Sequence, residues 1–112
     1  MSAKSSKAKG RRLQNFVRDK LRDLFPLLEE DDIKSQTMGM TGEDIVLSPA
    51  AQKKITYSFE CKNVEKVSIW KAMKQTIKNC PKERDPVLLI KRNQEPVYAI
   101  QLFEDWCKHL KK

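Results

Sequence analysis

Long apolar runs are missing from this chain of 112 residues. The longest ones, such as "PVLLI" at 86–90, fall far short of the ~20 residues needed to cross a bilayer. The basic N-terminus "MSAKSSKAKGRR" is not followed by the apolar stretch of a secretory signal. We therefore expect a soluble, intracellular protein of the cytoplasm that has no membrane partner.

Cysteine and histidine are also scarce. The three cysteines, Cys61, Cys80 and Cys107, form an odd set without a C-x-x-C pair. This set argues against a disulfide framework and against a closed zinc site. Cys107 lies two residues from the only histidine, His109, but a metal bound there would need two further ligands from elsewhere.

Aromatic residues are few, with 2 Trp, 2 Tyr and 4 Phe, and most stand at positions typical of a core. A stacking platform for single strands is therefore not indicated. Positive charge, in contrast, is in excess: the net charge is +8. Such an excess favours a polyanionic partner, with nucleic acid as the first candidate and an anionic membrane surface as the second.

The chain length allows one domain, and we expect a mobile basic arm over residues 1–10 followed by a single domain over 11–112. Residues 11–25 have the periodicity of an amphipathic helix with arginines opposite the apolar stripe. The expected stripe consists of Leu13, Phe16, Val17, Leu21 and Leu24, and the opposite side of Arg11, Arg18 and Arg22. Pro26 ends this helix, and residues 29–42 form a polar loop.

Two strands are expected next, at 43–49 and 53–62, joined as a hairpin by the short connection "SPAAQK". Apolar and polar residues alternate along the second strand, which indicates one core face and one open face. The core face comprises Ile55, Tyr57, Phe59 and Cys61, and the open face Thr56, Ser58, Glu60 and Lys62.

Residues 64–80 predict a second helix, followed by strands at 86–92 and 96–102 and a terminal helix at 103–112. The helix would bury Ile69, Trp70, Met73, Ile77 and Cys80 and would expose Lys71, Lys74, Gln75 and Lys78. Two strands connected through a helix are typically parallel. The fold class is thus α/β, with a small central mixed sheet flanked by helices.

Two carboxylates and a lysine form the main candidate site. Asp44 opens the first strand and Glu60 lies near the end of the second, so the hairpin would bring them together, with Lys62 on the face of Glu60. Two adjacent carboxylates repel each other unless a hard cation such as Mg²⁺ or Mn²⁺ binds both, and the Cys61 carbonyl between them could be a further ligand. Such a metal supports phosphodiester hydrolysis, and Lys62 would orient the attacking water or neutralise developing charge.

A surface charge pair is the alternative interpretation. The same spacing occurs at Asp32-Ile33-Lys34, which lies in the polar loop and has no upstream partner. Glu60 differs because it ends a strand pattern and has Asp44 as a partner.

The stretch "GEDIVLSP...YSFECKN" resembles the signature of the PD-(D/E)xK nuclease superfamily, with Asp44, Glu60 and Lys62 at the motif positions. The segments "KGRRLQNFVRDKL" and "VSIWKAMKQT" are similar to helices of archaeal-type Holliday junction resolvases and their phage relatives. This resemblance extends from Lys9 to about Leu102. It implies a restriction-endonuclease-like αβββαβ core, Mg²⁺-dependent cleavage of branched DNA, and a homodimer, acting in the host cytoplasm if phage-encoded.

Three positions need comment within this resemblance. Glu43 replaces the usual proline before the first aspartate, and Gln14 stands where the resolvases commonly have a metal-site glutamate. The resemblance therefore implies a catalytic position for Gln14, with weaker metal binding, one ion, or recruitment of Glu43 as consequences. Gln75 matches a position where related nucleases often have glutamine near the active site; the alternative is a solvated residue between lysines.

Cleavage without regard to sequence needs contacts to phosphates rather than to bases. The expected DNA contacts are Lys9, Arg11, Arg12, Arg18, Lys71, Lys74 and Lys78, and residues 96–106 could form the dimer interface. Other functions remain open: nicking, flap cleavage, repair or degradation of foreign DNA by the same chemistry, or binding of nucleic acid without catalysis. A protein of the membrane surface is the least favoured.

Overall fold

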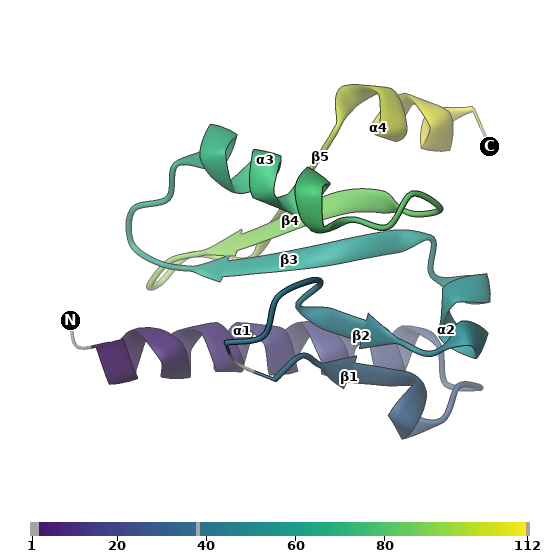
Figure 1. Ribbon diagram of the computed structural model, residues 1–112, viewed down its shortest axis with the longest axis horizontal. Helices are drawn as coiled ribbons and strands as arrows, with labels where there is room; N and C mark the ends of the chain where they lie inside the picture. Colours follow the sequence, from purple (N-terminus) through teal and green to yellow (C-terminus); the bar gives the residue numbers. More distant parts are fainter. Residues whose placement is uncertain (1–2, 38, 112) are drawn as a thin grey trace.

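The computed structural model describes residues 3–37 and 39–111 (Figure 1). Met1 and Ser2 of the expected arm and Lys112 of the expected domain lie outside the described residues. The elements in chain order are α1 (Ala3–Leu24), the 3-10 helix η1 (Glu30–Asp32), β1 (Ile33–Ser35), β2 (Ile45–Leu47), α2 (Pro49–Lys54), β3 (Tyr57–Asn63), α3 (Ile69–Asn79), β4 (Asp85–Lys91), β5 (Tyr98–Gln101) and α4 (Phe103–Leu110).

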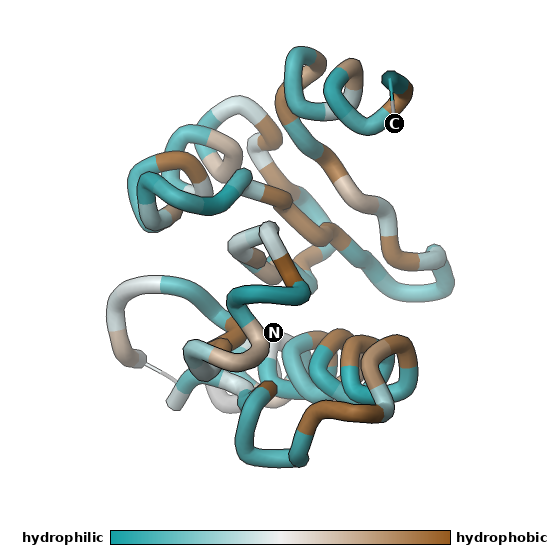
Figure 2. Tube along the Cα trace, turned by 90° about the vertical axis from the view of Figure 1, so that its right-hand side faces the viewer, coloured by the Kyte–Doolittle hydropathy of each residue, from teal (hydrophilic) through white to brown (hydrophobic). Residues whose placement is uncertain are grey.

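The central sheet has three strands in the order β3-β4-β5. β3 and β4 are parallel, and β4 and β5 are antiparallel. Helix α1 lies on one side of this sheet and α3 on the other (Figure 2). The α/β class with a small mixed sheet is thus confirmed, as is the parallel pairing across the helical connection.

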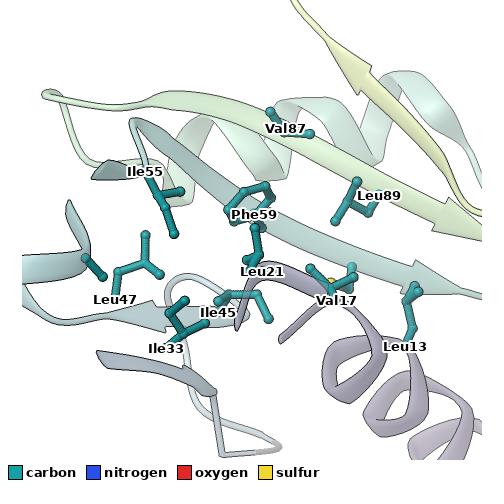
Figure 3. Packing of buried hydrophobic residues seen from close by; sticks show 12 residues of the cluster. Leu13, Val17, Leu21, Ile33, Ile45, Leu47, Ile55, Phe59, Val87 and Leu89 are labelled. Atoms are coloured by element: carbon teal, nitrogen blue, oxygen red, sulfur yellow. The ribbon is translucent and has the colours of Figure 1, made fainter. Parts of the chain in front are cut away.

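The core lies between α1 and the strands above it (Figure 3). Leu13, Val17 and Leu21 are buried and follow one another at intervals of four residues along α1, which places them on one helical stripe. They pack in one cluster with Phe59 and Cys61 of β3. The prediction that Cys61 faces the core is confirmed, and burial raises the pKa of its thiol.

Both faces of β3 are covered, contrary to the expectation of one open face. Ser58 is 3 % exposed and Glu60 5 % exposed, although both alternate with the core residues along the strand. The reason is α3, which packs against the sheet on the side opposite α1 (Figure 1). Polar residues on this face of β3 are therefore buried under a helix and need partners there.

Residues 3–10, which we expected as part of a mobile basic arm, are helical. Helix α1 already begins at Ala3, and Lys9 is only 5 % exposed. Lys9 Nζ donates to Glu65 Oε2 at 3.1 Å, and the Lys9 carbonyl accepts from Asn63 Nδ2 at 2.9 Å. These two contacts fix this turn of α1 against the end of β3.

The strand pairing also differs from the expected hairpin. β2 pairs with β1, a strand inside the segment that sequence patterns predicted as a loop, and the connection to β3 contains the helix α2. Ser48 caps α2 through its Oγ, which accepts from Ala51 N–H at 3.1 Å, and Pro49 occupies the first turn. Ser48 Oγ also donates to Asp32 Oδ1 at 2.6 Å, so Asp32 has a structural contact.

Several apolar residues assigned to helix stripes are exposed instead. Phe16 is 54 % and Leu24 63 % exposed on α1, and on α3 Trp70 is 82 % and Ile77 44 % exposed. The residues buried on α3 are the small Ala72 and Thr76. Small side chains let a helix approach a sheet closely, so they, and not the large apolar residues, face the strands.

No helix in the described part of the chain is long and apolar enough to span a membrane.

We predict that Leu13→Ala lowers the free energy of unfolding by about 2–5 kcal/mol, because Leu13 is 2 % exposed and its truncation leaves a cavity. Phe16→Ala, on the exposed side of the same helix, should cost less than about 1 kcal/mol. Urea denaturation followed by circular dichroism measures both values. Equal losses in the two variants would contradict this division of α1 into a buried and an exposed face.

Candidate active site

Asp44 connects the two sheets. Its backbone N–H donates to the Phe59 carbonyl at 3.1 Å, and its carboxylate Oδ2 accepts from the Cys61 backbone N–H at 2.7 Å. The carboxylate thus takes a position that a neighbouring strand would otherwise supply on this edge of β3. The expected proximity of Asp44 to β3 is therefore present, although the regular hairpin predicted to produce it is not.

Gln14 reaches Asp44 from α1. It is 6 % exposed, and its side-chain amide donates a hydrogen bond to the Asp44 carboxylate. Its Oε1 is buried and has no hydrogen-bond partner among the described residues. A buried carbonyl oxygen without a partner costs free energy, so this atom is suited to a ligand that supplies positive charge or a donor.

Glu60 is buried at 5 % exposure and accepts a side-chain hydrogen bond from Asn79 of α3. Burial, and after it the negative charge of Asp44, raises the pKa of Glu60 to about 6. The Asn79 hydrogen bond and the Lys62 charge act in the opposite direction. Burial likewise raises the pKa of Asp44, against the Cys61 N–H bond, the Lys62 charge and the Gln14 bond. The two carboxylates and Lys62 therefore form one electrostatic unit.

A cavity of about 280 Å³ opens beside the two carboxylates. Asp44 and Glu60 line it together with Gln75, Lys78 and Asn79 of α3. The remaining wall comes from residues Met40, Thr41 and Gly42. The cavity thus brings together both predicted carboxylates and the predicted Gln75, whereas Gln14 and Lys62 approach the carboxylates from the surrounding structure.

The oxygen atoms around this cavity are of the type that binds a hard cation such as Mg²⁺. Within residues 3–37 and 39–111, no three Asp, Glu, His or Cys side chains are grouped to hold a metal. The available oxygens are the carboxylates of Asp44 and Glu60, Gln14 Oε1 and the Cys61 carbonyl, which faces the same strand edge as the Cys61 N–H. Magnesium typically takes one or two carboxylates and completes its coordination with water and substrate phosphates.

Glu43 is engaged elsewhere. Its Oε1 forms an ion pair with Arg84 Nη2, whose side chain is 6 % exposed, and Arg84 Nη1 also donates to the Tyr57 carbonyl at 3.3 Å. The expectation that Glu43 could replace a metal ligand is therefore not supported, because its charge is neutralised by a buried guanidinium. Instead, this pair attaches the residue before Asp44 to the loop that precedes β4.

The predicted DNA contacts are distributed unevenly. Lys9, an expected DNA contact, is instead buried and paired with Glu65. Arg18 is bound to Asp19 Oδ1 at 2.9 Å and to Asn15 Oδ1 at 3.3 Å, and Arg12 lines a different cavity that includes neither acidic residue. The remaining predicted contacts are exposed: Arg11 on α1 and Lys71, Lys74 and Lys78 on α3.

Sequence patterns missed two residues that build the site. Asn79, which bonds Glu60, follows Gln75 by four residues, about one helical turn. This interval along α3 could have indicated that Asn79 lies beside Gln75 at the site. Arg84 gives no such signal, because its partner Glu43 is far away in sequence and belongs to another loop.

Comparisons of this chain with models of protein families, with curated proteins and with solved structures found no match.

We predict that, without metal, the stability of the protein falls as pH rises from the ordinary glutamate pKa of 4.5 to about 6. The folded state binds more protons than the unfolded state over this range, so ionisation of Glu60 opposes folding. Glu60→Gln cannot ionise and should gain about 1–2 kcal/mol relative to wild type between about pH 4 and pH 7. Urea denaturation in EDTA measures the difference. The exposed Glu104→Gln is the control, and an equal gain there would contradict the prediction.

A second prediction concerns the buried ion pair. Arg84→Met leaves the Glu43 carboxylate without its partner in a largely buried position and should destabilise the protein by about 3–5 kcal/mol. The double variant with Glu43→Met removes both charges and should recover most of that loss. Thermal and urea unfolding of the two single variants and the double variant test the coupling; additive losses would show that the two side chains do not interact.

Proposed function

We propose that this protein is a metal-dependent DNA endonuclease that hydrolyses phosphodiester bonds, most like a Holliday junction resolvase. One observation carries the proposal: two carboxylates with raised pKa values, Asp44 and Glu60, meet in a cavity also lined by Lys78. Burial of like charges opposes folding, so an arrangement of this kind is typical of functional sites.

The residues divide into ligands and positioning groups. Asp44 and Glu60 would hold Mg²⁺ or Mn²⁺, with the Cys61 carbonyl and Gln14 Oε1 as further oxygens. When bound, such an ion polarises a phosphoryl oxygen and activates water. Gln14 and the Cys61 N–H fix the orientation of the Asp44 carboxylate, and Asn79 fixes that of Glu60.

Lys62 supplies positive charge to the same unit. Its charge lowers the pKa values of both Asp44 and Glu60, which supports a role for it beside a group bound between them. It would orient the attacking water or offset negative charge that develops on the phosphate in the transition state. Gln75 and Lys78, on the opposite wall, would contact the phosphate backbone on either side of the scissile bond.

DNA is the proposed substrate because the chain carries a net charge of +8. The element order α1, β1, β2, β3, α3, β4 agrees with the core that the PD-(D/E)xK resemblance implies, once the short α2 is set aside. A branched substrate with two equivalent strands suits a two-fold dimer. Tyr98, Phe103 and Trp106 are 54 %, 68 % and 47 % exposed, which supports residues 96–106 as the proposed interface.

The test uses purified protein with a synthetic four-way junction, a flap and a matched duplex, in Mg²⁺, Mn²⁺ or EDTA. We expect cleavage only with metal and preferentially on branched DNA. Asp44→Asn, Glu60→Gln and Lys62→Met should each lower the rate by about 100-fold or more. Titration calorimetry with Mn²⁺ should show weaker metal binding in Asp44→Asn, measured without DNA.

Lys34→Met is the matched control, because Lys34 stands in the same Asp-x-Lys spacing but is exposed on β1. It should leave the cleavage rate within about 2-fold of wild type, as surface substitutions usually do. DNA binding without cleavage of any substrate would favour a non-catalytic nucleic-acid-binding protein. Cleavage retained in Glu60→Gln would place the active site elsewhere.

A further inference from the structure

Trp70 is the most exposed aromatic residue that the structure describes, with 82 % of its surface accessible. It lies in the first turn of α3, and the side of this helix that packs on the sheet is made by Ala72 and Thr76. A tryptophan contributes more apolar surface than any other side chain, so leaving it in water forgoes a large stabilisation. Its exposure is therefore better explained by a partner than by folding.

Three exposed lysines follow Trp70 along the same helix. Lys71 directly follows Trp70, and Lys74 and Lys78 lie four and eight residues after it. At a rise of about 1.5 Å per residue, Trp70 and Lys78 are ~12 Å apart along the helix axis. An apolar protein surface would have to desolvate these ammonium groups, whereas a polyanion with planar aromatic bases matches both the charge and the ring.

The charged face of α3 leads directly to the proposed site. Gln75 and Lys78 line the cavity that contains Asp44 and Glu60. Lys74 precedes Lys78 by one helical turn. A nucleic-acid strand whose phosphates follow Lys74 and Lys78 would therefore reach the carboxylates at one end of α3 and Trp70 at the other. This places Trp70 a short distance along the strand from the scissile phosphate.

We propose that Trp70 stacks on an unpaired or unstacked base of branched DNA while the lysines of α3 bind the phosphates of the same strand. In a continuous duplex the faces of every base are covered by its neighbours, so a stacking side chain finds a free face only at a branch, a gap or a kinked step. Trp70 would thus select branched over duplex DNA. The position of this contact relative to cleavage rests on the proposed function, but the binding itself does not.

Fluorescence provides a direct test, because the chain has only 2 tryptophans, Trp70 and Trp106. In Trp106→Phe, Trp70 is the only tryptophan, and a four-way junction added in EDTA should quench its emission strongly. The matched duplex should quench it much less. In Trp70→Phe the emission comes from Trp106 and should change little with either DNA. Equal quenching of Trp70 by junction and duplex would overturn the proposed selectivity.

Affinity provides the second measurement. Trp70→Ala should bind the junction about 5- to 100-fold more weakly and bind duplex nearly as wild type does, as expected for loss of one stacked base. Ile77→Ala, also exposed on α3, is the matched control and should change junction binding by less than about 2-fold. Unchanged junction binding by Trp70→Ala would overturn the proposal. So would a change from dimer to monomer in Trp70→Ala, seen by sedimentation, because Trp70 would then contact a second copy of the chain.

The two proposals fail in different ways. Quenching of Trp70 by the junction together with no cleavage in Mg²⁺ or Mn²⁺ would refute the endonuclease and retain the stacking contact. Cleavage that depends on Glu60, with no quenching and no loss in Trp70→Ala, would retain the endonuclease and refute the contact.

Discussion

The hydrogen bond from the Cys61 N–H to the Asp44 carboxylate is the contact on which the rest of the site depends. Together with the bond from Asp44 N–H to the Phe59 carbonyl, it joins the small β1–β2 sheet to the edge of β3. Because side chains alternate along a strand, fixing Cys61 in the core directs Glu60 to the opposite face. One residue thus links two sheets and supplies a carboxylate to the site.

The surroundings of the candidate site offset the cost of burying two carboxylates. Burial raises the pKa of Glu60 to about 6, which works against folding at neutral pH, and the neighbouring Asp44 adds to the effect. Buried pairs such as Arg84 with Glu43, and the apolar cluster beneath β3, hold the carboxylates in place despite that repulsion. Sites that need close like charges commonly rely on a rigid scaffold in this way.

Helix α3 shows why periodicity alone assigned the wrong face. Its large apolar residues lie on one stripe, and a stripe of this kind normally faces the core. The sheet is instead contacted by Ala72 and Thr76, whose small side chains let the helix lie close to the strands. Asn79 of the same helix bonds Glu60. Trp70 is consequently left in solvent beside the lysines, where it is available to a partner.

The sequence by itself determined the local features: the alternation along β3 that buries Cys61 and sets Glu60 on the opposite face, and the helical crossover that makes β3 and β4 parallel. These follow from periods of two and of 3.6 residues, which depend on neighbours in the chain. Tertiary structure alone decided the pairing of β1 with β2, the burial of Lys9 against Glu65 and the Arg84–Glu43 pair. Each of these joins segments distant in sequence, so no local pattern encodes it.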